Sequence, residues 1–234
     1  MKIKVDAMVY VLLFFGIFIL GTPAAASCPS EERFCTKKMD ITTKSDFVMS
    51  YNPILCDAKT GEYRWIVIQS RFLKDTNFNR NWTDYKNGFG TPCKTDFWIG
   101  NEMIYQITSM GEFQLRIDLT FLGNAYYGTY NNFKVDSEKN NYKMSFGTYS
   151  GNVSDDFSAH NNMMFSTPDR DNDSDEKRFC AQIYGSGWWY ADCHNVHLNG
   201  QFDSPTLGTR VTWFSISSNW HSLNSTEMKI RRVK

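Results

Sequence analysis

The chain has 234 residues with 25 basic and 25 acidic side chains, so its formal net charge at pH 7 is zero. This balance argues against binding to nucleic acid or to an acidic lipid surface through overall charge. Aromatic side chains make up 16% of the residues and include seven tryptophans, which predicts an ordered, globular protein rather than a disordered one.

The N-terminus has the layout of a secretory signal peptide. Two early lysines precede an apolar run at residues 8–20, and small residues follow at 24–26. A membrane-spanning helix needs about 20 apolar residues, and this run is too short. We therefore expect residues 1–26 to be cleaved and residues 27–234 to form a secreted, extracellular protein that is not embedded in a membrane.

Cysteines and glycosylation sequons fit this secretory route. The six cysteines all follow the cleavage point, at Cys28, Cys35, Cys56, Cys93, Cys180 and Cys193. An even number in an oxidising compartment predicts a disulfide framework, although sequence alone does not fix the pairing. Zinc is disfavoured, because no C-x-x-C pair is present and only His194 and His197 are closely spaced. Sequons start at Asn81, Asn152, Asn172 and Asn224, of which we expect Asn81, Asn152 and Asn224 to carry glycans.

Regular elements are predicted mainly in the first half of the chain. Residues 63–72 are predicted to form a strand, and the apolar run at 65–68 is typical of a strand buried on both faces. A short helix is predicted at 82–86, before an Asn-Gly pair, and another at 101–108, where two isoleucines have helical spacing. Apolar and polar side chains alternate along 113–120, as in a strand with one buried face, and residues 142–146 repeat this period.

The second half has a different composition. From residue 147 to residue 219 the chain is rich in Gly, Asn, Asp and Ser and has little periodicity. Long irregular segments usually carry function or need covalent constraints. We therefore predict a sheet-centred first half and a loop-rich second half that contains the functional site.

An acidic segment with the sequence DRDNDSD occupies residues 169–175. Alternating carboxylates place several hard oxygens around one point, as calcium requires, and without a cation they would repel one another. An EF-hand is excluded, because Ser174 stands in the place of the turn glycine and Cys180 in that of the bidentate glutamate. The alternative is a solvated acidic turn, and the spacing alone does not separate the two.

Residues 185–194 combine small residues with three aromatics and a Cys193-His194 pair. They could form a wall for a small ligand, since sugars stack on aromatic faces, but for Trp188 we prefer a place in the core beside a disulfide. A cysteine–histidine nucleophile needs a free thiolate, which a secreted Cys193 would not offer. Common motifs of hydrolases, zinc proteases and phosphate-binding loops are missing from the sequence, so we expect no enzymatic activity.

A series of motifs between residues 35 and 232 occurs in the order of one family. In chain order they are WIVIQSR at 65–71, NWTDYKNGFG at 81–90, DFWIGNE at 96–102, YSGN at 149–152, FSTPDRDND at 165–173, the cysteines and aromatics of 180–194, LNG at 198–200 and EMK at 227–229. The series resembles the fibrinogen-related domain of fibrinogen chains, ficolins, tachylectins, angiopoietins and invertebrate defence lectins. This resemblance implies an α+β fold, with a mainly antiparallel central sheet, short helices and a loop-rich C-terminal subdomain that holds a calcium site.

The resemblance also implies disulfide pairs. Cys180 should pair with Cys193. Either Cys35 or Cys28 should pair with Cys56, and we prefer Cys35. Cys28 and Cys93 would then pair with each other or link chains in a homo-oligomer.

For calcium, the resemblance implies side-chain ligands at Asp171 and Asp173, with backbone carbonyls near Asp175 and Lys177 completing the shell. The chain departs from the family pattern here. Its stretch from Asp173 to Cys180 is one residue longer than usual and lacks the family's glycine.

In ficolin-like members, a site beside the calcium loop holds an acetyl group or a sugar. Cys193 and His194 match the backbone amide and the histidine of that site, and the resemblance implies a cis peptide bond before Cys193. Asn219 and Trp220 stand where tyrosines are usual. The implied function is a calcium-dependent, lectin-like recognition protein that binds carbohydrate or acetylated ligands on microbial or cell surfaces, as in innate defence. The alternatives are a secreted ligand of a cell-surface protein receptor, as angiopoietins are, and a venom component.

Overall fold

The computed structural model describes residues 55–57, 60, 65–217 and 221–233. The predicted signal peptide, Cys28, Cys35, Asn219 and Trp220 lie outside these residues, so the predictions about them stay predictions.

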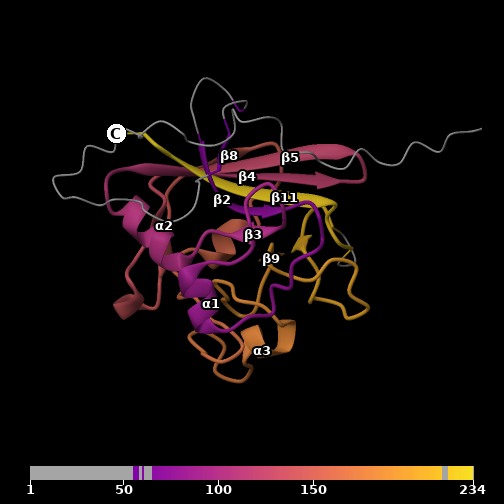
Figure 1. Cartoon of the computed structure of the whole chain (residues 1–234). Coiled ribbons are helices and arrows are strands. Elements are labelled where there is room, and N and C mark those ends of the chain that lie inside the picture. The colour runs from indigo at the N-terminus through magenta and orange to yellow at the C-terminus, as the bar shows by residue number, and fades with distance from the viewer. Residues whose placement is uncertain (1–54, 58–59, 61–64, 218–220, 234) are drawn as a thin grey trace, which may run out of the picture.

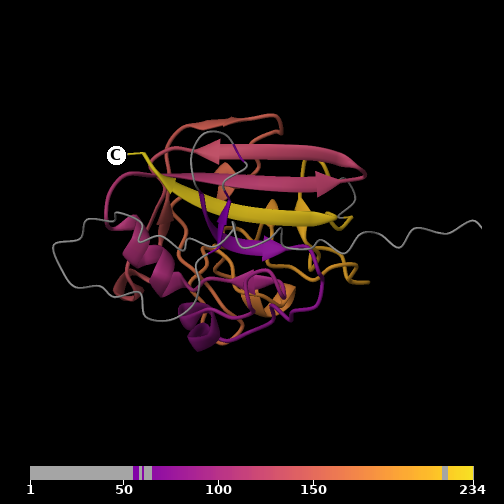
Figure 2. The same cartoon turned by 45° about the horizontal axis from the view of Figure 1, so that its top comes forward.

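A seven-stranded antiparallel sheet forms one layer of the molecule (Figures 1 and 2). Its strands follow the order β1-β2-β11-β4-β5-β8, and β3 also pairs with β2. Their bounds are Cys56–Asp57 for β1, Trp65–Arg71 for β2, Phe97–Trp98 for β3, Phe113–Phe121 for β4, Asn124–Tyr130 for β5, Tyr149–Gly151 for β8 and Ser225–Arg232 for β11. The last strand, β11, therefore inserts between two strands from the first half of the chain.

Helices and short strands lie on one side of this sheet (Figure 1). The helices are α1 (Trp82–Asn87), α2 (Asn101–Thr108) and α3 (Cys180–Tyr184), with 3-10 helices η2 (Glu138–Asn140) and η3 (Phe157–His160). Two small antiparallel pairs join β6 (Lys134–Val135) to β7 (Met144–Ser145), and β9 (Val196–His197) to β10 (Thr212–Trp213). The described part of the second half is loop-rich, as the sequence indicated.

The predicted elements of the first half are confirmed. Every residue of β2 is buried, and along β4 buried and half-buried residues alternate. Helix α2 has the predicted bounds, and α1 extends one residue beyond them, to Asn87. The repeat at 142–146 forms only a two-residue strand, because Tyr142 has a φ of 47°, which extended backbone does not allow.

Helix α1 is bounded by local chemistry. The Asn81 side chain accepts a 2.8 Å hydrogen bond from the backbone N–H of Asp84, as an N-cap residue does. At the other end Gly88 has a φ of 87°, and a Cβ there would lie 2.5 Å from the carbonyl oxygen of Ile99. Only glycine fits this position, so the helix ends there.

One hydrophobic core fills the space between the sheet and the helices. Its largest fully buried side chains include four tryptophans, Trp98, Trp188, Trp189 and Trp213. The preferred interpretation of Trp188 as a core residue is therefore confirmed, and the tryptophan pair of 185–194 offers no exposed wall to a ligand.

On the opposite face of the sheet, Lys229 ties three strands together. Its ammonium nitrogen lies 2.5 Å from Oδ2 of Asp57, 2.6 Å from Oδ2 of Asp118 and 3.1 Å from Oε1 of Glu227. Only 3% of the lysine side chain is exposed.

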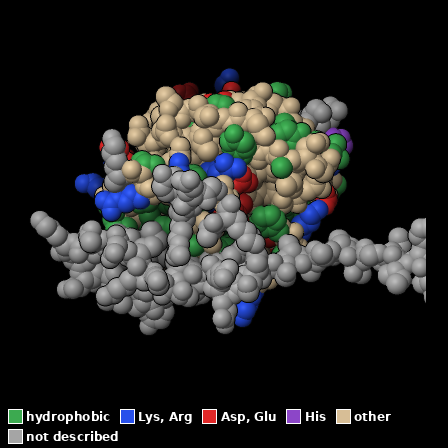
Figure 3. Space-filling model, turned by 90° about the horizontal axis from the view of Figure 1, so that it is seen from above, with side chains coloured by type: hydrophobic (Ala, Val, Ile, Leu, Met, Phe, Trp, Pro, Cys, Tyr) green, Lys and Arg blue, Asp and Glu red, His purple; other side chains and the backbone are tan. Residues whose placement is uncertain are grey.

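The face shown in Figure 3 carries basic, acidic and apolar side chains interspersed, in keeping with the zero net charge. Within the described ranges, no helix is long and apolar enough to cross a membrane.

A buried polar network fixes the C-terminal loops to the sheet. The Gln69 side chain on β2 donates to the Leu198 carbonyl at 3.2 Å and to Oδ1 of Asn199 at 2.9 Å. Asn199 in turn donates to the carbonyl of Gly187 at 2.9 Å. Since buried polar groups that find partners hold their surroundings in one arrangement, this network anchors the segments on both sides of Cys193.

Candidate functional site

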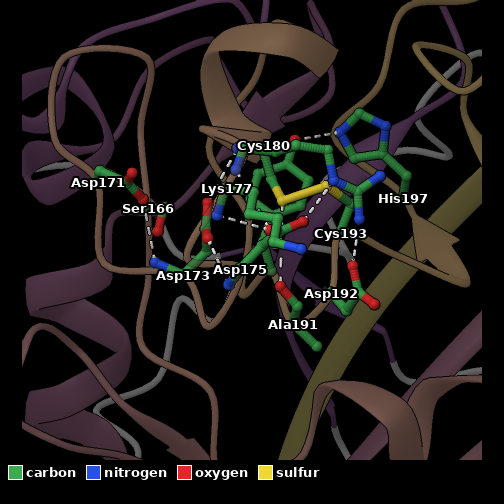
Figure 4. The surroundings of a disulfide bond; sticks show 12 residues. Ser166, Asp171, Asp173, Asp175, Lys177, Cys180, Ala191, Asp192, Cys193 and His197 are labelled. Atoms are coloured by element: carbon green, nitrogen blue, oxygen red, sulfur yellow. Dashed lines mark hydrogen bonds and ion pairs between the residues drawn. A yellow bond between two sulfur atoms is a disulfide. The ribbon is translucent and has the colours of Figure 1, made fainter.

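A disulfide joins Cys180, which follows the acidic segment, to Cys193, which directly precedes His194 (Figure 4). Cys180 begins α3, and its Cα lies 5.3 Å from that of Cys193. Both residues are buried, and the predicted pairing is confirmed. Cys56 and Cys93 are also disulfide-bonded, and the predictions about Cys35 and Cys28 lie outside the described residues.

The carboxylate of Asp169, the first in the acidic segment, accepts a hydrogen bond from the start of helix α1. Oδ1 of Asp169 accepts a hydrogen bond of 2.9 Å from the backbone N–H of Trp82 and one of 2.7 Å from the Thr167 hydroxyl. The partners of this carboxylate are therefore a helix end and a neighbouring hydroxyl.

The last carboxylate of the segment is also engaged. Oδ1 of Asp175 accepts from the backbone N–H of Lys177 at 3.0 Å, and Oδ2 contacts the guanidinium of Arg178. The hydrogen bond from Lys177, followed by the interactions with Arg178, lowers the pKa of this carboxyl. Asp175 therefore already has a cationic partner.

Asp171 and Asp173 remain as a close pair of carboxylates. Asp173 accepts from the backbone N–H groups of Asp175 and Cys180, both at 2.9 Å, and Oδ1 of Asp171 accepts from the N–H of Asp173 at 3.2 Å. Burial raises the pKa of Asp173 to about 6, and the neighbouring Asp171 carboxyl adds to this. Two adjacent carboxylates that resist joint ionisation offer hard oxygens to a divalent cation.

A second grouping of ligand atoms does not form a metal site. The side chains of Asp175, Cys180 and Cys193 place one atom each within 4.8 Å of one another. Both sulfurs belong to the disulfide, however, and metals bind cysteine as the thiolate.

The turn into Cys193 differs from expectation. No peptide bond among the described residues is cis, so the predicted cis bond between Asp192 and Cys193 is wrong. Instead Cys193 adopts a φ of 43°, and its carbonyl accepts a 2.9 Å hydrogen bond from the N–H of Ala191. The left-handed backbone of Cys193 makes the turn that a cis bond would otherwise make.

His194 lies in an aromatic cluster with only 8% of its surface exposed. Its ring centroid is 4.6 Å from that of Tyr184, edge to face, and 4.6 Å from that of His197, with the two imidazoles stacked. Burial lowers the pKa of His194 to about 3. The imidazole is therefore neutral at physiological pH, and it offers polarity without charge.

His160 holds the segment after His194 in place. Its Nε2 accepts from the N–H of Val196 at 3.1 Å, so Nδ1 carries the proton and donates to the carbonyl of Trp189 at 2.8 Å. The side chain is fully buried, and burial lowers its pKa to about 4.

Sequence reasoning missed Tyr184 and Gly208 at this site. Tyr184 is half-buried, with its ring against His194. A Cβ at Gly208, where φ is 80°, would lie 2.6 Å from the Tyr184 ring, so only glycine lets this loop close on the tyrosine. The signal was present, since Tyr184 falls on α3 one helical turn after Cys180.

The expected glycosylation sites are all exposed. The side-chain oxygens of Asn81, Asn152 and Asn224 accept backbone hydrogen bonds, from Asp84 at 2.8 Å, Tyr127 at 2.7 Å and Leu122 at 2.8 Å. Asn172, within the acidic segment, instead turns its amide nitrogen inward to the Phe165 carbonyl at 2.8 Å. This arrangement favours the first three as glycan carriers, which stays a prediction.

Comparison with known proteins places this architecture in a family. The profile of the fibrinogen beta and gamma chains, C-terminal globular domain, matches residues 34–233. Fibrinogen-like protein 1 of Bos taurus is 39% identical over 196 residues, which cover 76% of this chain and 62% of the relative. Tenascin-R of Homo sapiens is 37% identical over 178 residues, which cover 76% of this chain and 13% of the relative. The chain thus spans less than two thirds of these relatives.

Solved structures give the same result. The fibrinogen-like globe domain of human ANGPTL2 matches with a TM-score of 0.75 and 32% identity, covering 82% of this chain and 91% of that chain. The lamprey fibrin D-dimer, complexed with the peptide ligand Gly-His-Arg-Pro-amide, matches with a TM-score of 0.72 and 32% identity, covering 79% and 66%. The sheet order, the disulfide and these similarities lead to one conclusion: the chain belongs to the family of fibrinogen C-terminal globular domains.

Proposed function

We propose that this chain is a secreted recognition protein that binds carbohydrate or acetylated ligands at the Cys193-His194 site, and that calcium held by Asp171 and Asp173 fixes this site. The observation that carries the proposal is the connection between the two parts. Asp173 accepts the backbone hydrogen bond of Cys180, and Cys180 is bonded to Cys193. A cation on Asp173 would therefore be connected to His194 through this hydrogen bond, the disulfide and the peptide bond after Cys193.

The residues present fit calcium. Asp171 and Asp173 supply carboxylate oxygens, which calcium prefers, and their mutual repulsion is relieved by a divalent cation. Asp169 and Asp175 have other partners, which leaves a site of two side chains. Backbone carbonyls near Asp175 and the exposed Lys177, together with water, would complete the shell.

The surroundings of His194, next to Cys193, suit an uncharged ligand group. His194 stays neutral at physiological pH, and the half-buried ring of Tyr184 lies against it. Neutral polar groups beside an aromatic ring are what a sugar or an acetyl group uses, since such ligands combine hydrogen-bonding atoms with apolar faces.

The test is binding of the purified protein to beads coated with acetylated or non-acetylated glycans, with calcium or with EDTA. We expect calcium-dependent binding that His194→Ala and Asp171→Asn both weaken, while Lys139→Ala, on the exposed η2 surface, serves as a control. Near-ultraviolet circular dichroism checks that each variant is folded. Undiminished binding by His194→Ala would place the site elsewhere on the domain.

A ligand of a cell-surface protein receptor is the second candidate. It is favoured by the similarity to the ANGPTL2 globe and to that of human ANGPTL6, which has a TM-score of 0.74 and 34% identity. The lamprey fibrin D-dimer, which the chain also resembles, is complexed with a peptide ligand. Binding to cells that survives glycosidase treatment but is lost after mild proteolysis of the cells would favour this candidate over the lectin.

A further inference from the structure

Arg178 connects two segments on opposite sides of the disulfide. Its Nε contacts Oδ2 of Asp175, and its Nη2 contacts Oδ1 of Asp192. Asp175 belongs to the acidic segment, whereas Asp192 directly precedes Cys193. The guanidinium therefore forms an ionic bridge that runs beside the covalent one.

The disulfide and the ionic bridge constrain the chain at two neighbouring residues, Cys193 and Asp192. The Cys180–Cys193 bond fixes one point on each segment, with the Cα atoms 5.3 Å apart. Buried residues and the hydrogen bond from Ala191 to the Cys193 carbonyl hold the backbone of this turn. The ion pair with Arg178 adds a tie at the exposed Asp192, directly before Cys193, so Arg178 and the disulfide act together on the direction in which the chain enters His194.

A continuous path leads from the carboxylate pair to this bridge. Oδ1 of Asp173 accepts from the N–H of Asp175 at 2.9 Å, and Asp175 accepts from the N–H of Arg178 at 3.2 Å as well as from its guanidinium. Ordering Asp173 therefore orders Asp175, and Asp175 orients the arginine that holds Asp192.

The exposure of the bridge indicates a positioning role rather than a role in global stability. The side chains of Arg178 and Asp192 are 47% and 83% exposed, and exposed ion pairs contribute little to the free energy of folding. Arginine suits the position because its planar fork donates in two directions at once, which a lysine ammonium on a flexible stem does less well.

We propose that Arg178 is a positioning residue that transmits the effect of a cation at Asp171 and Asp173 to Asp192, and through it to His194. The proposal rests on the calcium site proposed above. It predicts that calcium changes the surroundings of His194 through Arg178, not through the disulfide alone.

The experiment uses calcium alone as the probe, on the full secreted chain. Correlation spectra of protein with labelled histidines follow the imidazole signal of His194, assigned by comparison with His194→Gln, during a calcium titration. We expect the His194 signal to move in the wild type and to move much less in Arg178→Gln, in which only the path through Cys180 and Cys193 is left. Calorimetry should still detect calcium binding by that variant, because the arginine is not a ligand. Arg80→Gln is the matched control, since it removes a half-buried arginine that pairs with Asp84 at 3.8 Å on another surface.

Further variants protect the test against misfolding of any one protein. Asp192→Asn breaks the bridge from the other side and should weaken the response to the same extent, and the double variant should lose nothing more, as expected for partners in one interaction. Arg178→Lys keeps the charge but loses the planar fork that donates in two directions, so it should restore only part of the response.

An unchanged His194 response in Arg178→Gln and Asp192→Asn would overturn the proposal. If the wild type binds no calcium, the calcium site and this inference both fail. If calcium moves His194 through Arg178 but no glycan binds, only the lectin function fails.

Discussion

The backbone N–H of Trp82 donates a 2.9 Å hydrogen bond to Oδ1 of Asp169, so the first carboxylate of the acidic segment caps a distant helix. The first N–H groups of a helix have no partner within it. Asp169 satisfies one of them in α1, while the Asn81 side chain satisfies another.

Asp169→Ala should therefore lower stability without removing a calcium ligand. Loss of a cap costs about 1 kcal/mol, which urea denaturation in EDTA would measure as a lower free energy of unfolding. Calorimetric titration should still give a full calcium stoichiometry. Glu176→Ala, at an exposed acid of the same loop, is the control for lost charge. Abolished calcium binding by Asp169→Ala would show that this carboxylate is a ligand after all.

His160→Phe should destabilise the segment after His194. The phenyl ring fills the volume but leaves the Val196 N–H and the Trp189 carbonyl without their imidazole partner. Each unsatisfied buried group costs about 1–3 kcal/mol, so we expect a loss of about 3 kcal/mol in the free energy of unfolding. His221→Phe, at the exposed histidine, is the control. Equal stability of the two variants would contradict the anchoring role.

The buried histidines make the fold sensitive to acid. Burial lowers the pKa of His160 to about 4 and that of His194 to about 3, and it lowers the pKa of His197 well below its ordinary value. In the unfolded chain these groups titrate near 6.5, so below that pH the unfolded state binds protons that the folded state does not. Each such histidine lowers the free energy of unfolding by about 1.4 kcal/mol per pH unit until its folded pKa is reached.

Asp173 acts in the opposite direction. Its pKa is raised to about 6 in the folded state, so its protonation favours folding as the pH falls below that value. Burial raises the pKa of Glu227 as well. The three histidines outweigh these two carboxylates, and the urea midpoint in EDTA should fall between about pH 6.5 and 4. A midpoint that stays constant across this range would show that the imidazoles are accessible to protons in the folded protein.

Lys229→Met should lower the free energy of unfolding more than a typical surface substitution does. Removing the ammonium leaves the carboxylates of Asp57, Asp118 and Glu227 close together on the sheet, and breaking a buried ionic group costs about 3–5 kcal/mol. Lys134→Met, which breaks an exposed pair with Asp136, should change the free energy of unfolding by less than about 1 kcal/mol. A comparable loss in both variants, read from urea denaturation, would argue against a special role for Lys229.

Local patterns identified the regular elements, whereas long-range contacts decided the site. The alternation in β4 and the isoleucine spacing in α2 are set by which face is buried, so they are readable from sequence. The helix-capping role of Asp169 depends on Trp82, which is distant in sequence, and the pairing of Asp175 with Arg178 depends on a turn that no periodicity specifies. The cis bond before Cys193 was expected from the resemblance alone, and it is wrong, because Cys193 follows a trans bond and has a φ of 43°.

Calcium titration of the folded domain by calorimetry tests the central claim most directly. We expect a single site in the wild type and in Asp169→Asn, and none in Asp171→Asn combined with Asp173→Asn. Calcium at about one hundred times its dissociation constant should stabilise the wild type by about 2.7 kcal/mol, visible as a higher melting temperature that the double variant does not show. Binding of equal strength by the double variant, or an unchanged melting temperature of the wild type in calcium, would contradict a recognition site fixed by calcium at Asp171 and Asp173.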